Sequence, residues 1–170
     1  MMEDTPLDAA TARHDLASES RPPAAMRRQL VESLYTEAMV LADEVRSYFE
    51  RDGQEERRQL GPIVRIGYSC ESLKTTTRLM HVIAWLLTQR AIDANEIDEE
   101  EAGNHDRLLG DAVPSDPDIC RKLPDSARLL IASSEQLYKR TLRLQELFLN
   151  GTSTAENPVH EMLHRLQSSY

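Results

Sequence analysis

The most constraining feature of this sequence is a run of small and apolar residues that recurs at helical spacing from residue 63 to residue 91. Steps of three and four residues alternate there without interruption, which is typical of a helix that packs on a neighbouring helix at a shallow angle. We call these nine residues the heptad seam: Ile63, Ile66, Cys70, Leu73, Thr77, Met80, Ala84, Leu87 and Ala91.

A second apolar stripe, Leu79, Ile83 and Leu86, lies beside the heptad seam, and Val82 and Trp85 widen it. A helix that is apolar nearly all round is buried on more than one side. The pattern therefore predicts a central helix, or one that also forms a subunit interface. We expect a homodimer that buries part of this surface and expect Val82→Asp to give monomers or insoluble protein. The candidate residues for the dimer and the core are Leu79, Met80, Val82, Ile83, Trp85, Leu86 and Leu87.

Two further helices have similar apolar spacing, so the expected fold is an all-α three-helix bundle with long helices. They span about 25–51, 63–93 and 125–150 within a domain of residues 25–150. In the first, the apolar stripe is Leu30, Leu34, Leu41, Val45 and Tyr48. Asn150-Gly151 is a typical C-terminal stop for the third.

The two ends of the chain are expected to be flexible. Residues 1–24 are polar and lack an apolar period, which predicts a disordered extension. Residues 151–170 form a predicted tail with one short amphipathic helix, which would be marginal in water without a docking surface. Its apolar residues are Val159, Met162, Leu163 and Leu166.

Acidic residues are concentrated in the predicted loop 94–124. From Asp93 to Asp118 there are ten acids and one base, Arg107, while the rest of the chain has 19 acids and 19 bases. This distribution disfavours a nucleic-acid partner, because such proteins usually have a basic patch. We expect residues 94–118 to stay mobile and solvated, and a short charged helix is compatible with Ile97 to Leu109. Glu99, Glu100 and Glu101 are candidates for docking to a basic partner, and a spacer without a partner is the alternative.

No group of residues has the spacing of a catalytic, cofactor or metal site. His160 and His164 are four residues apart but lack further ligands, and His81 has no evident acid or nucleophile beside it. Cys70 and Cys120 are too few for a disulfide framework. No apolar run approaches the roughly 18–20 residues of a membrane-spanning helix. We therefore expect a cytoplasmic protein that is not an enzyme and does not bind a membrane.

The stretch from Glu71 to Ala91 resembles the central segment of the alphaproteobacterial regulator-of-CtrA-degradation (RcdA) family. The matching groups are Thr77-Arg78-Leu79-Met80, Trp85-Leu86-Leu87 and Gln89-Arg90-Ala91. The resemblance covers about residues 28–150. It implies a three-helix domain that dimerises and acts as a non-enzymatic adaptor in ClpXP-mediated proteolysis during cell-cycle control. The partners it implies are the protease subunit ClpX, its regulatory partners and its substrates.

Two other functions are compatible with a chain of this kind. A structural or scaffolding helical dimer unrelated to proteolysis has the same sequence features. A helical enzyme or metal-binding bundle would need inward-facing Glu and His pairs on facing helices. The apolar seams carry Leu, Ile, Met, Ala and Thr instead, which disfavours this third function.

Overall fold

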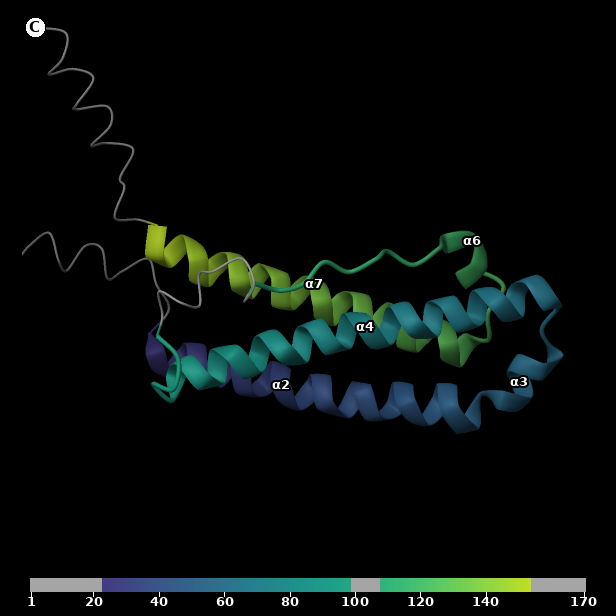
Figure 1. The fold of residues 1–170 in the computed structure, drawn as a ribbon, viewed down its shortest axis with the longest axis horizontal. Helices are drawn as coiled ribbons and strands as arrows, with labels where there is room; N and C mark the ends of the chain where they lie inside the picture. Colours follow the sequence, from purple (N-terminus) through teal and green to yellow (C-terminus); the bar gives the residue numbers. More distant parts are fainter. Residues whose placement is uncertain (1–22, 99–107, 154–170) are drawn as a thin grey trace, which may run out of the picture.

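A computed structural model of the protein describes residues 23–98 and 108–153, and within them the chain is all-α with no strand. Three long helices form a bundle: α2 (Ala24–Ser47), α4 (Pro62–Asp93) and α7 (Asp125–Ser153) (Figure 1). This confirms the predicted fold class. The predicted helices 25–51, 63–93 and 125–150 agree with these bounds within a few residues. The predicted N-terminal extension (except its last two residues) and the tail helix lie outside the described residues.

Helix α2 ends differently from its prediction, because a π-helical turn, η2 (Tyr48–Asp52), and the short helix α3 (Gln54–Gln59) follow it directly. The connection between the first two predicted helices is therefore partly helical. The buried stripe of α2 contains Leu34, Leu41, Val45 and Tyr48, as expected. Leu30 is 39% exposed, because it lies beside the stripe that faces the other two helices.

Helix α4 has clear start and stop signals. Pro62 is the first helical residue, where its missing N–H costs no hydrogen bond. At the other end, Asn95 has a φ of 57°, and its N–H donates to the Ile92 carbonyl at 2.9 Å. The Glu96 N–H donates to the Ala91 carbonyl at 2.9 Å. This pair of bonds is a Schellman motif, which explains why the helix ends at Asp93 as predicted.

The direction of α7 is set by the connection that precedes it. Short connections in helical bundles favour antiparallel neighbours, and α2 and α4 are antiparallel, whereas α7 runs in the same direction as α4 (Figure 1). Residues 108–116, which we call the strap, return along the bundle to α6 (Pro117–Cys120). An extended chain advances about twice as far per residue as a helix. Nine extended residues can therefore span about eighteen helical ones.

The strap corrects two predictions for the acidic segment. Residues 108–118 are not loose solvated chain, because Leu109 is 7% exposed and packs in the main core cluster. Neither Ile97 nor Leu108-Leu109 is helical. An apolar side chain and bonds to the strap backbone outweigh the repulsion between acids at this place. Residues 99–107 lie outside the described residues.

The core between the helices consists of two clusters of buried side chains. The larger contains Ala38 of α2, Val82, Trp85 and Leu86 of α4, and Leu137 of α7. The smaller lies at the α3 end and contains Tyr48, Tyr68 and Ile131. Helix α7 continues through Asn150-Gly151 to Ser153, so the predicted stop is a few residues early.

Candidate interaction surface

The heptad seam of α4 faces solvent along almost its whole length. Its five large apolar side chains are exposed: Ile63 by 77%, Ile66 by 67%, Leu73 by 69%, Met80 by 63% and Leu87 by 45%. The small residues between them, Cys70, Thr77 and Ala84, are also exposed, and Ala91 is half-buried. The side of α4 that the spacing marks as a packing face thus has no partner in the described part of the chain.

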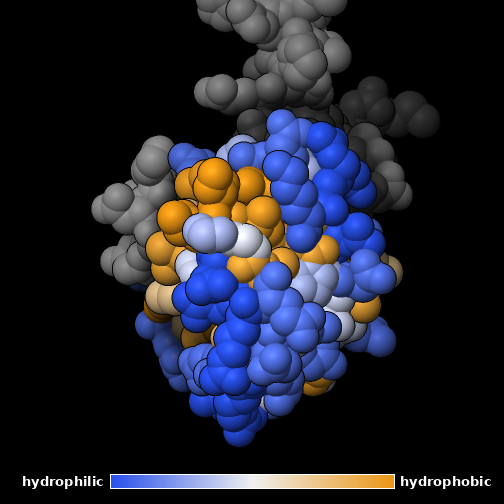
Figure 2. Space-filling model, turned by 90° about the vertical axis from the view of Figure 1, so that its right-hand side faces the viewer, coloured by the Kyte–Doolittle hydropathy of each residue, from blue (hydrophilic) through white to orange (hydrophobic). Residues whose placement is uncertain are grey.

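The start of this face is visible from the end of the molecule that carries α3 and α6. Figure 2 shows apolar side chains gathered on one side of an otherwise mainly hydrophilic surface. The exposed large apolar residues near this end include Ile63 and Ile66 at the start of α4, Leu73 two turns further on, and Leu129 near the start of α7. Contiguous exposed apolar patches of this kind mark interaction sites.

The residues predicted for the dimer surface and core divide between the two sides of α4. Met80 and Leu87 are exposed members of the heptad seam, and Ile83 is half-buried. The other four lie in the bundle core with at most 3% exposure: Leu79, Val82, Trp85 and Leu86. The choice of Val82 as an exposed interface residue was therefore wrong, because α2 and α7 cover it completely. The second stripe fills the core, and the heptad seam is the outer face.

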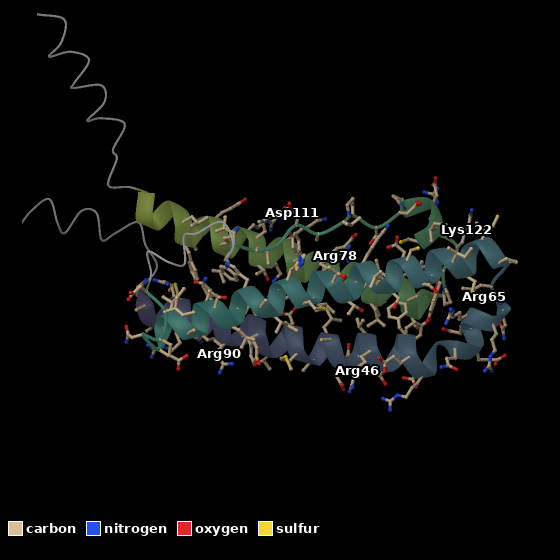
Figure 3. All side chains as sticks on the ribbon, viewed as in Figure 1. Arg46, Arg65, Arg78, Arg90, Asp111 and Lys122 are labelled. Atoms are coloured by element: carbon tan, nitrogen blue, oxygen red, sulfur yellow. The ribbon has the colours of Figure 1, made fainter. Side chains whose placement is uncertain are left out.

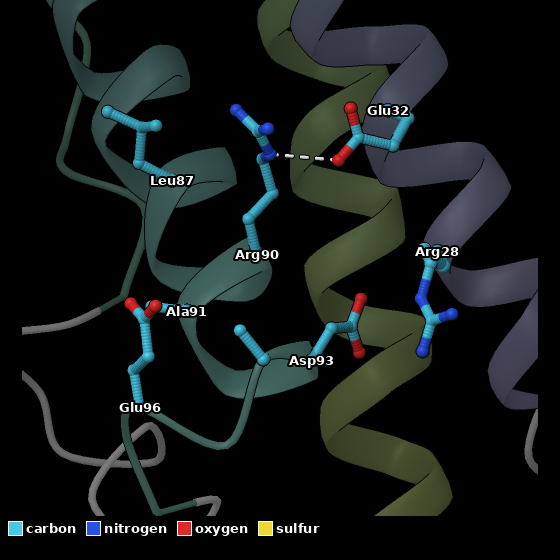
Figure 4. Close-up of a pocket in the computed structure, with 8 residues that line it drawn as sticks. Arg28, Glu32, Leu87, Arg90, Ala91, Asp93 and Glu96 are labelled. Carbon is cyan, nitrogen blue, oxygen red and sulfur yellow. Dashed lines mark ion pairs between the residues drawn. The ribbon is translucent and has the colours of Figure 1, made fainter.

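A hollow of about 590 Å³ lies where the heptad seam ends, between the last turns of α4 and the start of α2. We call it the terminal hollow; Leu87, Ala91 and Ala94 form its apolar wall. Its charged residues are Arg28, Glu32, Arg90, Asp93 and Glu96. Figure 4 shows Arg90 reaching from α4 to Glu32 of α2, with an Nε–Oε1 distance of 2.8 Å. Arg90 also lies 4.6 Å from the centre of the Tyr35 ring.

The opposite, buried face of α4 carries polar residues that hold the strap. Arg78 is 2% exposed and donates from Nη1 to Ser134 Oγ of α7 at 2.7 Å. Its Nη2 donates to the Val113 carbonyl at 3.1 Å and to Ser115 Oγ at 3.3 Å. Figure 3 shows Arg78 directed toward the strap at mid-length of the bundle. One guanidinium therefore joins α4, α7 and the strap.

Three more side chains bind the strap backbone in sequence. Glu71 Oε1 accepts the Asp116 N–H at 3.0 Å and also pairs with Lys74 Nζ at 2.7 Å. Tyr138 donates its hydroxyl to the Gly110 carbonyl at 2.9 Å, and Gln145 Oε1 accepts the Leu109 N–H at 2.6 Å. A buried backbone group left without a partner would be costly, so these bonds keep the strap in the groove.

Gly110 allows the strap to approach His81 closely. A Cβ atom at this position would lie 2.8 Å from His81 Nδ1. His81 is half-buried, and its Nδ1 has no hydrogen-bond partner among the described residues. The histidine therefore forms a packing surface for the strap backbone. Gly67 of α4 plays a similar part for α6, since a Cβ there would lie 2.6 Å from Ile119 Cγ2.

Sequence reasoning missed the strap-binding residues. Arg78 belongs to the Thr-Arg-Leu-Met group, but that pattern predicts only a helix and gives no sign that this arginine binds the strap. A charged residue at a position that faces the core is a usable signal, because buried charges are nearly always paired. The acidic docking candidates Glu99, Glu100 and Glu101 lie outside the described residues.

The residues that could bind a metal or act as a nucleophile lie apart or are shielded in the described part of the chain. No three His, Cys, Asp or Glu side chains come together there as metal ligands would. Burial, and then the Glu71 carboxylate, raise the pKa of the Cys120 thiol, which leaves it a poor nucleophile. None of the helices in this part of the chain has the length and apolarity that a membrane crossing needs.

Comparison with known proteins places the chain in a family. Residues 23–170 match the model of the family described as protein of unknown function (DUF1465). The chain belongs to this family. The DUF1465 match includes the tail 154–170 as well as the helical bundle.

A solved structure extends this finding. The crystal structure of RcdA from Caulobacter crescentus CB15 is similar to the DUF1465 chain, with 30% sequence identity and a TM-score of 0.58. The similarity covers 70% of this chain and 90% of that chain. The chain is thus an RcdA-like family member, which confirms the resemblance found in the sequence. No curated protein matches the chain.

Proposed function

We propose that this DUF1465 chain is a non-enzymatic, homodimeric adaptor or regulator of ClpXP-mediated proteolysis in the cytoplasm, with a role in cell-cycle control. The observation that carries the proposal is the exposed heptad seam of α4, in a chain that is 30% identical to RcdA over 70% of its own length and 90% of the RcdA chain. An adaptor needs stable surfaces for partners and no active site. The exposed seam, on a bundle that the strap holds together, supports the first of these requirements.

A reconstituted degradation assay tests this function. Purified ClpX and ClpP from the same alphaproteobacterium would be mixed with a response regulator that they degrade, with and without the full chain. We expect the chain to bind ClpX or the regulator and to increase the degradation rate. Capture on tagged chain would identify which of the two it contacts.

A pair of variants shows whether the exposed seam takes part. Met80→Asp changes the seam, and Leu129→Asp changes an equally exposed residue of α7, since the two side chains are 63% and 67% exposed. We expect the first variant to lose stimulation and the second to keep it. Equal stimulation by both would remove the seam from the mechanism.

A scaffolding helical dimer unrelated to proteolysis is the second candidate, because the exposed seam supports self-association by itself. A chain that dimerises but binds neither ClpX nor any response regulator would select the scaffold. The degradation rate would then be the same with and without the chain.

The acidic residues Glu99, Glu100 and Glu101 are proposed to dock to a basic partner surface. Replacing all three with Gln should slow association with ClpX or the regulator at low salt, because exposed charges steer encounter and are screened by salt. An unchanged association rate in a folded variant would leave this segment as a spacer.

A further inference from the structure

From Ile66 to Ala91, the residues of the heptad seam alternate in size, and the proposed homodimer does not by itself explain this order. Large residues recur every seventh position at Ile66, Leu73, Met80 and Leu87. Small residues recur every seventh position between them at Cys70, Thr77, Ala84 and Ala91. All of them lie on the outer face of α4, and the large ones are at least 45% exposed. A partner surface for this face must have a complementary alternation of size.

We propose that a second copy of the chain covers the seam with its own α4 in antiparallel orientation, so that each large residue packs on a small one. The proposal rests on the homodimer of the proposed function and adds its surface, direction and register. Two antiparallel seams place one kind of position opposite the other in every layer. The facing pairs are Ile66 with Ala91, Leu73 with Ala84, Met80 with Thr77, and Leu87 with Cys70.

A parallel arrangement would pack the same seam poorly. Each residue would then face its own counterpart, which places Leu73 on Leu73 and Ala84 on Ala84. Layers of two large residues hold the helices apart, and the layers of two small residues between them are left with voids. Interdigitated packing needs large residues opposite small ones. Only the antiparallel register provides this in each layer.

The terminal hollow supports the same register independently. Continuing the pairing by one step places Ile63, the most exposed apolar residue of the seam, against Ala94 of the second copy. Ala91 and Ala94 line the terminal hollow (Figure 4). The hollow at the end of one α4 would therefore receive Ile63 and Ile66 from the start of the other. In a parallel pair, two hollows would face each other and stay empty.

Charge at the two ends of α4 favours the antiparallel direction too. Arg65 stands beside Ile66 at the start of α4 (Figure 3), and among the described residues its side chain donates to the carbonyls of Arg58 and Leu60. Asp93 and Glu96 stand at the terminal hollow, and neither pairs with a base among the described residues. Antiparallel packing brings the end of α4 that carries Arg65 to the end of the second copy that carries Asp93 and Glu96. Parallel packing brings like charges together, which is unfavourable.

Native Cys70 provides a direct test of orientation, because the register places it against Leu87 of the second copy. The protein would carry Cys120→Ser and Leu87→Cys, with Cys70 retained, and would be treated with a mild oxidant or a short bis-maleimide. We expect a covalent dimer on a non-reducing gel. Because residue 70 faces residue 87 of the second copy, the two copies of residue 70 are 17 helical positions apart, which is about 25 Å. The same distance separates the two copies of residue 87. Cys120→Ser alone, and Cys70→Ala with Cys120→Ser and Leu87→Cys, should therefore give no covalent dimer.

The outcomes separate this proposal from the proposed function. Cross-linking through Cys70 alone would show parallel helices, and a dimer in light scattering without any 70–87 cross-link would show another interface. Either result overturns the register and leaves the homodimer. A mass of 19.3 kDa for the unaltered chain at micromolar concentration would overturn both. Binding to ClpX is measured separately and does not depend on the cross-link.

A size exchange tests the pairing of Leu73 with Ala84. Ala84→Leu overpacks two symmetric layers and Leu73→Ala empties them, so each should weaken dimerisation about tenfold or more. Combining the two restores one large and one small residue in each layer, and the double variant should dimerise within a few-fold of the original. Both residues are strong helix formers, so α4 itself is preserved. Additive weakening in the double variant would overturn the register.

Discussion

Along α4, the face turned toward the bundle carries Glu71, Thr75 and Arg78, whereas the face turned toward solvent carries Ile66, Leu73 and Met80. A surface helix usually has the reverse arrangement, with its apolar stripe on the core. The inner face is polar at Glu71 and Arg78, which bind the strap, and apolar at Tyr68 before them and from Leu79 to Leu86 after them. The difference teaches that packing within a single chain accounts for only one of the two faces of α4. Its inner face specifies the fold of one chain, and its outer face suits an interaction between chains.

The largest contrast between these faces is expected from the same substitution at two nearby positions. Val82 is fully buried, so Val82→Asp should lower the free energy of unfolding by more than about 4 kcal/mol, because a charge would be placed in the core. Met80→Asp should leave the helical signal and the unfolding midpoint of the monomer nearly unchanged. Circular dichroism and urea unfolding measure both. Comparable losses in the two variants would remove the distinction between the faces.

The polar part of the inner face can be tested at Arg78. Arg78→Ala should cost about 3 kcal/mol, because it removes a buried cation that joins Ser134, Val113 and Ser115. Hydrogen exchange at the Leu109 and Asp116 amides should become faster as the strap loosens. Urea unfolding measures the loss in the free energy of unfolding.

Arg140→Ala is the control for this effect. Arg140 pairs with Glu37 at 2.6 and 2.8 Å but is half exposed, so its loss should cost no more than about 1 kcal/mol. Equal costs for the two arginines would mean that the strap contacts add nothing to the bundle.

The fit of the strap on the inner face predicts a smaller effect at Gly110. Gly110→Ala should cost about 1–2 kcal/mol, because the new Cβ would press on the ring of His81. Gly61 is the matched control, since nothing lies within 4 Å of a Cβ added there. Gly61→Ala should be neutral or slightly stabilising, because it restricts the unfolded chain. Thermal unfolding of the two variants measures the difference in their stability. This difference would vanish if the strap moves away from His81 at little cost.

The smallest expected effect is a pH dependence at the α3 end of the inner face, where Tyr48 lies beside Tyr68. Burial, and then the hydrogen bond from its hydroxyl to Glu56 at 2.6 Å, raise the pKa of Tyr48 above the usual value of about 10. The folded state therefore holds this proton more tightly than the unfolded state. Its contribution to stability is full below about pH 10 and is lost as the pH rises further.

Tyr48→Phe tests this contribution in alkaline urea unfolding. The variant should lose less stability than the unaltered chain between about pH 9 and 11, because no hydroxyl remains to ionise at this position. Tyr35, half-buried beside Arg90, offers a control as Tyr35→Phe. Parallel pH profiles for the unaltered chain and Tyr48→Phe would contradict the expectation.

Much of the fold was predictable because it depends on local pattern. The start of α4 follows from Pro62, and its length follows from an unbroken helical period. The RcdA resemblance also rests on short residue groups and was confirmed by comparison. The strap was not predictable in this way. The ten acids and one base from Asp93 to Asp118 favoured a solvated segment. The actual position of the strap depends on bonds to four side chains from distant parts of the chain: Gln145, Tyr138, Arg78 and Glu71.

The sequence by itself determined that three long helices form and that α4 has two apolar stripes, because helical periodicity is a property of neighbouring residues along the chain. It did not determine which stripe lies inside. The tertiary structure decided this by placing α7 parallel to α4 and laying the strap in the groove between them. Leu79, Val82, Trp85 and Leu86 are then enclosed, while Ile63, Ile66, Leu73 and Met80 stay outside. Either stripe has the period of a buried helix face. Only the arrangement with the second stripe inside surrounds the buried guanidinium of Arg78 with partners that offset its loss of water.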